Sequence, residues 1–217
     1  MDDPVIEEAR QARIAELEAR VGRPASVGVR PFVALVGVGV AGYLAAHYAP
    51  DAQYFSSPKE AIALGAEGDY HFERLTHNRY AQVRGTPTAR AAYGRIGEKT
   101  FVAVGLVESP VIVWRAALPT EQWKAGGAPP PPDKSAFTAR GRLIARQQVP
   151  DRYASAFTRH DEINEVNAQW LLLDGERPGS DFAGAGLFAG LVALCALNAW
   201  LLVRGLAAWW RPKPVAT

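Results

Sequence analysis

Two uncharged stretches decide the fold class: FVALVGVGVAGYLAAHY at residues 32–48 and FAGAGLFAGLVALCALNAWLLV at residues 182–203. Neither stretch contains Asp, Glu, Lys or Arg. A helix rises about 1.5 Å per residue, so each stretch is close to or above the length that crosses a hydrocarbon core of about 30 Å. The sequence therefore predicts two transmembrane helices, at residues 31–48 and 182–203.

Two other interpretations fit these stretches less well. A helix buried in a soluble protein rarely runs past about 14 residues without a charge. A secretory signal peptide has a short basic head, whereas the residues before Phe32 include six acidic residues and five arginines. We interpret the first stretch as an uncleaved signal anchor.

Cations flank both predicted spans on the sides of the chain termini, and such residues favour the cytoplasm. They are Arg20, Arg23 and Arg30 before the first span, and Arg204, Arg211 and Lys213 at the end of the second. Trp200, Trp209 and Trp210 suit an aromatic belt at that interface. The pattern predicts a bacterial inner-membrane protein with both termini in the cytoplasm and residues 49–181 in the periplasm.

The two spans divide the chain into further segments. Residues 1–30 are expected to form a cytoplasmic amphipathic helix, over 4–22, and a linker; residues 204–217 form a cytoplasmic tail. The helix is either a docking or coiled-coil element or a solvated surface helix, since little more than two heptads are present. Cys195 is the only cysteine and lies in the second span, so residues 49–181 hold no disulfide and no thiol site.

The extracytoplasmic segment 49–181 carries the signals of a β-rich α+β domain, expected as a small barrel or sandwich. Ser57-Pro58-Lys59-Glu60 is a capping box that predicts a short helix ending at Gly65. Short runs of aromatic and β-branched residues predict strands. These runs are DYHFERL (69–75), RYAQVRG (79–85), TFVAVGLV (100–107), VIVWRAAL (111–118, apolar enough for a central strand), AFTARGRLIARQQV (136–149) and WLLLDG (170–175).

Other parts of the segment have different signals. Residues 151–169 are polar and helix-like, with Tyr153 and Phe157 facing inward. Pro129–Pro132 can form neither helix nor interior strand, and they predict a stiff surface loop or a polyproline ligand. YAQVRG and FTARG share an aromatic residue followed by Arg-Gly, which is either a short internal repeat or a chance match.

Metal and catalytic sites have little support in the sequence. Asp69, His71 and Glu73 alternate, so on one strand they would share a face, with His77 as a further ligand. The same alternation fits the solvent face of an amphipathic strand, which is the simpler interpretation. His160-Asp161-Glu162 is interpreted as a polar loop cluster. No nucleophile elbow, phosphate loop or dinucleotide fingerprint is present, so we expect no catalytic residues and no cofactor.

Charge is uneven along the extracytoplasmic segment. Arginines cluster at 79–95 and again at 140–146, whereas acidic residues cluster at 161–181. The basic segments either face lipid headgroups or an acidic partner, or pair with the acidic segment inside the fold. Nucleic acid is not expected as a partner on the far side of a membrane.

Small residues recur on both predicted spans at the spacing that lets helices approach closely. Gly37, Ala41 and Ala45 lie on the first span, and Gly186 and Gly190 lie on the second. Asn198 is a polar residue deep enough in the second span to need a hydrogen bond. These six residues form a helix-packing set, for contacts either within the chain or with a partner.

The layout of two spans around a β-rich domain resembles two families. One is the surfeit-locus family of cytochrome oxidase assembly factors. The other is a two-span family of ubiquitin-ligase-like membrane proteins, to which YAQVRGTPTA followed by ESPVIVWR is loosely similar. The tail lacks RING cysteines, so ligase activity is not implied. The resemblance concerns the layout alone.

The sequence thus predicts a non-enzymatic, membrane-anchored accessory or assembly protein. Its expected contacts are membrane lipid and a membrane-protein partner or a second copy of the chain. The alternative is a periplasmic metal- or ligand-binding membrane protein, and the third is a membrane-anchored enzyme.

Overall fold

The computed structural model describes residues 10–11, 13–16, 29–123 and 128–209. The chain divides into two compact units, Met1–His47 with Leu187–Thr217 and Tyr48–Gly186. Residues 10–11 and 13–16 are helical. The rest of the predicted helix at 4–22, and most of the predicted tail, lie outside the described residues.

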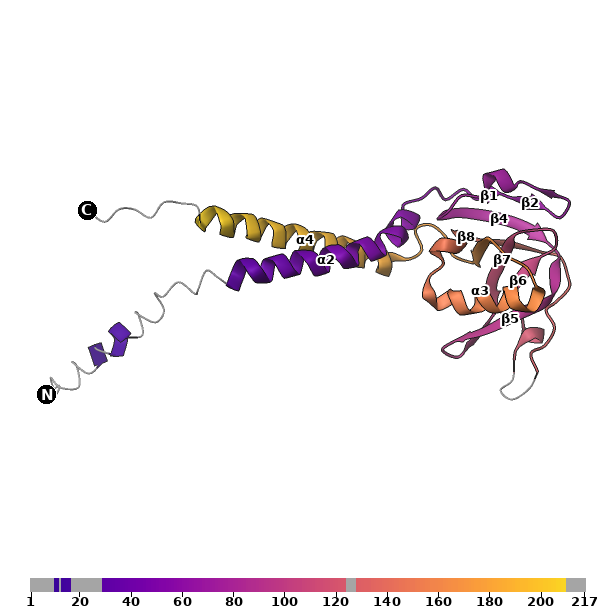
Figure 1. Ribbon diagram of the computed structural model, residues 1–217, viewed down its shortest axis with the longest axis horizontal. Coiled ribbons are helices and arrows are strands. Elements are labelled where there is room, and N and C mark those ends of the chain that lie inside the picture. The colour runs from indigo at the N-terminus through magenta and orange to yellow at the C-terminus, as the bar shows by residue number, and fades with distance from the viewer. Residues whose placement is uncertain (1–9, 12, 17–28, 124–127, 210–217) are drawn as a thin grey trace. The chain divides into compact units, whose positions relative to one another are not determined.

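The predicted spans are single long helices (Figure 1). Helix α2 covers Val29–Phe55, with Pro50 inside it, and α4 covers Phe182–Trp209. Within them, Phe32–Phe55 and Phe182–Ala207 are long and apolar enough to cross a membrane, by length and composition. Both helices run several residues past the predicted ends of the spans.

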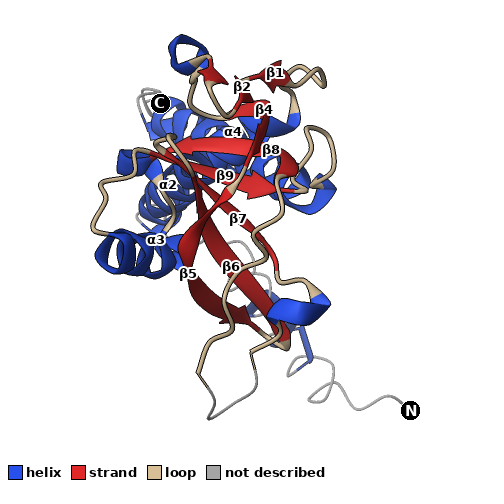
Figure 2. Ribbon diagram, turned by 90° about the vertical axis from the view of Figure 1, so that its right-hand side faces the viewer, coloured by secondary structure: helices blue, strands red, loops and turns tan. Residues whose placement is uncertain are grey.

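The second unit is built on a mixed seven-stranded sheet in the order β1-β4-β8-β9-β7-β6-β5 (Figure 2). Its strands are β1 (Ile62–Ala63), β4 (Arg79–Gly85), β5 (Pro87–Ile96), β6 (Lys99–Leu106), β7 (Val111–Ala116), β8 (Phe137–Ala145) and β9 (Trp170–Asp174). The pairs β1–β4 and β7–β9 are parallel, and the other pairs are antiparallel. Strands β2 (Gly65–Ala66) and β3 (Asp69–Tyr70) form a separate two-stranded sheet.

Both faces of the large sheet are buried. Helix α3 (Asp151–Asn164) packs on one face, where Trp114, Tyr153 and Phe157 belong to the same apolar cluster (Figure 2). On β9, Leu171 and Leu173 join this cluster, whereas Leu172 joins the cluster on the opposite face. This alternation follows the two-residue period of a strand, and WLLLDG forms the predicted strand. The helix predicted within residues 151–169 covers Asp151–Asn164.

Strand β7 is central, as its apolar sequence predicts, because it lies between β9 and β6 and five of its six residues are buried. Strand β8 ends earlier than predicted, since Arg146–Gln148 form a short 3₁₀ helix, η3. Strand β5 was not predicted. Its alternation is weak, and only its pairing with β6 orders it into an edge strand.

Strand β4 runs into β5 with only Thr86 between them, and the Val107 N–H that follows β6 donates to the Thr86 carbonyl at 3.0 Å. The unit is therefore of the predicted β-rich α+β class, with α3 packed on a mixed sheet. A small barrel or sandwich stays a prediction.

The predicted helix after Ser57 is wrong. Residues 56–61 form a turn and bends and no helix, because α2 continues to Phe55 and the serines cap its end. The Ser56 hydroxyl donates to the carbonyls of Ala52 and Gln53, and the Ser57 hydroxyl donates to the Tyr54 carbonyl.

The two similar segments YAQVRG and FTARG lie on adjacent strands. Strand β4 pairs with β8 from Arg79↔Leu143 to Gly85↔Phe137. Gly141 is required where β8 meets β9, because a Cβ there would lie 1.7 Å from the carbonyl oxygen of Leu173. The glycine in this segment thus serves a close backbone approach.

Candidate functional site

The helix-packing set separates into an occupied face and an open one. On α2, Ala34 and Ala41 are buried, and a Cβ added at Gly37 would lie 2.8 Å from Oδ1 of Asn198. The Asn198 amide donates to the Leu194 carbonyl within its own helix at 2.8 Å. The Gly37–Ala41 face is therefore used for contact between α2 and α4 of one chain, and Ala45 lies half-buried beyond it.

The small residues of α4 behave differently. A Cβ built at Gly186 or at Gly190 meets no atom of the described residues within 4 Å. Both glycines are exposed. The structure brings Asn198 to the α2 face and leaves the Gly186–Gly190 face uncovered by the described chain.

The weak metal candidates do not share a strand face. Strand β3 ends at Tyr70, and Phe72–Arg74 turn into a 3₁₀ helix, η1, so His71 and Glu73 leave the line of Asp69. His77 lies before β4, and its Nδ1 accepts the backbone N–H of Ala145 at 3.2 Å. Among the described residues, no group of three or more His, Cys, Asp or Glu side chains is placed to hold a metal ion.

The densest group of charges in the sheet unit surrounds Arg142 on β8. We define the Arg142 cluster as Asp51, Tyr54, Asn78, Arg142 and Glu176. Arg142 is buried and donates to Asp51 Oδ1 at 2.6 Å and to Asn78 Oδ1 at 2.7 Å. Its guanidinium also stacks over the Tyr54 ring at 4.9 Å. These three partners offset part of the desolvation of the buried cation.

Further hydrogen bonds of the Arg142 cluster join distant parts of the unit. The Tyr54 hydroxyl donates to the Glu176 carbonyl, and the Asn78 amide donates to the Pro50 carbonyl, each at 2.8 Å. The cluster therefore ties residues 50–54 to β8 and to the segment after β9.

A cavity of about 360 Å³ lies beside the Arg142 cluster. Burial raises the pKa of the Glu176 carboxyl above its ordinary value, although Arg142 and Arg152 oppose the effect. The cavity is lined by Tyr48, Asp51, Tyr54, Phe55, Arg142, Arg152, Tyr153, Glu176, Arg177, Ser180, Asp181 and Gly184. The lining includes three arginines and three acidic residues, so charges of both signs face the cavity.

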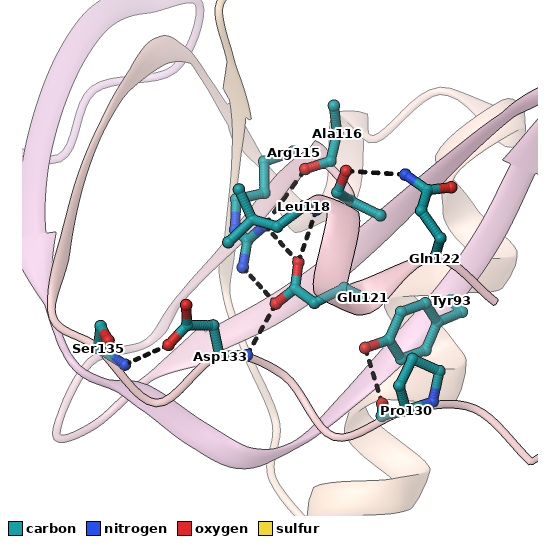
Figure 3. A network of polar contacts seen from close by, with 10 residues as sticks. Tyr93, Arg115, Ala116, Leu118, Glu121, Gln122, Pro130, Asp133 and Ser135 are labelled. Carbon is teal, nitrogen blue, oxygen red and sulfur yellow. Dashed lines mark hydrogen bonds and ion pairs between the residues drawn. The ribbon is translucent and has the colours of Figure 1, made fainter.

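A second buried ion pair holds the connection after β7 (Figure 3). Glu121 lies in the 3₁₀ helix η2 (Pro119–Glu121), and its side chain is 1% exposed against 8% for Arg115. Both carboxylate oxygens accept from Arg115 at 2.7 Å, and they also accept the backbone N–H groups of Leu118 and Asp133. Burial alone would raise the pKa of Glu121, but these donors together lower it.

The Glu121 network also positions the proline-rich loop. Asp133 follows the four prolines directly, and the Tyr93 hydroxyl donates to the Pro130 carbonyl at 2.8 Å (Figure 3). These bonds fix both flanks of the described part of the loop against the sheet. The Glu121 network therefore has a structural role.

One basic segment meets the acidic segment inside the fold, which was one of the two interpretations of the charge pattern. Arg146 pairs with Asp161 and also donates to the Ala168 carbonyl at 2.7 Å. The interpretation of residues 160–162 as a loop was wrong, because they lie on α3 and His160 is buried. The inward helical face that carries Tyr153 and Phe157 also carries His160, a signal that the sequence did contain.

The chain was compared with protein-family models, with curated proteins and with solved structures, and none of them matches it. Function must therefore be argued from the residues and their geometry.

Proposed function

We propose that the chain is a non-enzymatic, membrane-anchored accessory or assembly protein of a larger membrane complex. The observation that carries the proposal is the exposure of large apolar side chains along both long helices. Val40 and Tyr43 of α2, and Leu197 and Val203 of α4, are between 52% and 73% exposed. Apolar surface of this extent is stable in lipid or against a partner, and it is unfavourable in water.

The orientation proposed from the sequence is that both termini lie in the cytoplasm and the sheet unit lies in the periplasm of a bacterium. The positive-inside rule supports it, through the cations near both termini. Arg204 stacks over the Trp200 ring at 5.3 Å, an amphipathic pair suited to the interface at the end of α4.

The accessory role is supported by how α4 uses its faces. Contact with α2 occupies Asn198, whereas Gly186 and Gly190 contact nothing within the described chain. Helices associate in lipid through close van der Waals packing, which small residues permit. A helix of a partner protein, or of a second copy, would fit this open face.

The test is co-purification in mild detergent of the wild type and of a Gly186→Ile/Gly190→Ile double variant. The bulky side chains would hold a partner helix away, so the variant should insert normally but lose the proteins that co-purify with the wild type. Gly39→Ile on α2 is the matched control, because a Cβ there also meets no atom of the described residues within 4 Å. The accessory role would be contradicted if Gly39→Ile also lost the co-purifying proteins, or if the wild type purified as a lone monomer.

A further inference from the structure

His160 is a buried polar side chain without a hydrogen bond. It lies on α3, it is 1% exposed, and among the described residues neither Nδ1 nor Nε2 has a hydrogen-bond partner. A neutral imidazole offers one donor and one acceptor. Leaving both unpaired in the interior is unfavourable, so such a group requires an explanation.

The polar side chain beside His160 does not supply the missing hydrogen bond. Asp161 Oδ1 lies 3.7 Å from His160 Nδ1, which is too far for a hydrogen bond. Asp161 is already engaged by Arg146 and by the backbone N–H of Ala168. Burial lowers the pKa of His160 although Asp161 opposes the effect, so the imidazole is neutral at neutral pH.

The other edge of the ring faces a glycine. A Cβ added at Gly105 of β6 would lie 2.7 Å from Nε2 and 3.0 Å from Cε1 of His160. A side chain at position 105 would therefore press against this edge. The same Cβ would lie 3.2 Å from the methyl group of Thr88 on β5, so Thr88 lies beside this edge of the ring.

His160, Gly105 and Thr88 all line one cavity of about 460 Å³. The rest of its wall comes from the connection between β6 and β7 and from residues 166–168. It includes the apolar Leu106, Val107 and Val166, and at the rim the polar Glu108, Ser109 and Asn167. Volumes of about 300–1,000 Å³ with mainly apolar walls and few polar groups are typical of small-molecule sites.

We propose that this cavity binds a small, neutral, largely apolar molecule that carries one hydroxyl or carbonyl group, which hydrogen-bonds to His160. A movement of the half-buried Thr88 side chain opens the path to the ring. Apolar side chains line the cavity along the body of the ligand, and its polar group pairs with Nε2 of the imidazole. The site lies wholly within the sheet unit, so this inference does not depend on the accessory role.

The probe pair is 2-naphthol and naphthalene, which differ by a single hydroxyl. Binding is measured by calorimetry on the full chain in lipid nanodiscs, with empty nanodiscs as the reference for partition into lipid. We expect 2-naphthol to bind about tenfold more tightly than naphthalene, the effect of one hydrogen bond to a buried group. It should also shift the imidazole ¹⁵N resonances of His160, which are assigned by their loss in His160→Phe.

His160→Phe should remove the difference between the two probes and leave naphthalene binding unchanged. The variant should fold, because it replaces an unpaired polar ring with an apolar ring of similar shape. Three outcomes would each overturn the proposal. The wild type could bind both probes equally, it could show no saturable binding of 2-naphthol, or His160→Phe could keep the preference for 2-naphthol.

A second variant tests the cavity without altering the core. Val166 lines this cavity and is 48% exposed. Ile96 is also 48% exposed but lines a different cavity. Ile96→Trp is therefore the matched control for Val166→Trp. Val166→Trp should lose binding of both probes, and Ile96→Trp should bind as the wild type does. Normal binding by Val166→Trp, or equal loss in both variants, would assign the probes to another site.

Discussion

Arg115 and Glu121 form a bidentate ion pair, in which each terminal nitrogen of Arg115 donates to one carboxylate oxygen of Glu121 at 2.7 Å. The two residues are six positions apart, on β7 and on the turn that follows it. Because both are buried, neither charge has water as an alternative partner.

Removing one partner of this pair should destabilise the sheet unit strongly. Arg115→Met or Glu121→Gln alone should each cost about 3 kcal/mol, since the remaining charged or polar partner is left buried. The double variant should cost much less than the sum of the two. Pulse proteolysis across a urea series, on the protein in detergent, measures these losses. Exposed Arg95→Met is the control, and additive losses would contradict the coupling.

Acid should weaken the contribution of Glu121. Its pKa is lowered in the fold from an ordinary value of 4.5, so the stabilisation is complete above that value and is lost as the pH falls through the folded pKa. The difference in urea midpoint between the wild type and Glu121→Gln should therefore be constant from pH 7 to 5 and shrink below about pH 4.5. An unchanged difference at pH 3 would contradict this assignment.

Glu176 should behave in the opposite way. Burial raises its pKa, so the native state favours the protonated form, and the stability present at low pH is lost as the pH rises through the folded value. Glu176→Gln, which mimics the neutral form, should raise the urea midpoint at pH 7 and change little at pH 4. The hydrogen bond from the Tyr54 hydroxyl to the main-chain carbonyl of Glu176 does not involve the side chain, so the substitution leaves it in place. Glu98→Gln, at an exposed position, is the control and should change the urea midpoint at neither pH. A Glu176→Gln variant less stable than the wild type at pH 7 would refute the prediction.

Topology is tested with reporters in intact spheroplasts. Tags at either terminus should resist added protease, and a tag beside Pro130 should be cleaved, because that loop is expected in the periplasm. Permeabilised spheroplasts, in which all tags should be cleaved, are the control. Protection of the Pro130 tag together with cleavage of both terminal tags would reverse the proposed orientation.

Some of the candidate site residues could be predicted from the local sequence, and others could not. The glycine spacing on α2 and α4 was visible, but only the fold shows that Asn198 covers Gly37 and leaves Gly190 open. The alternation of Asp69, His71 and Glu73 predicted a shared face that the short β3 strand does not provide. Alternation in sequence becomes a shared face only when neighbouring strands extend the segment.

The sequence by itself determined the two apolar helices, helix α3 and the central strands β7 and β9, since these follow from uncharged length and from local periodicity. Tertiary structure alone decided the contact between Asp51 and Arg142, which lie 91 positions apart, and the burial of His160 against Gly105. It also decided the order of the strands in the mixed sheet. The physical reason is that periodicity reports which side of an element is apolar, whereas the partner of a buried polar group is chosen by packing between distant segments.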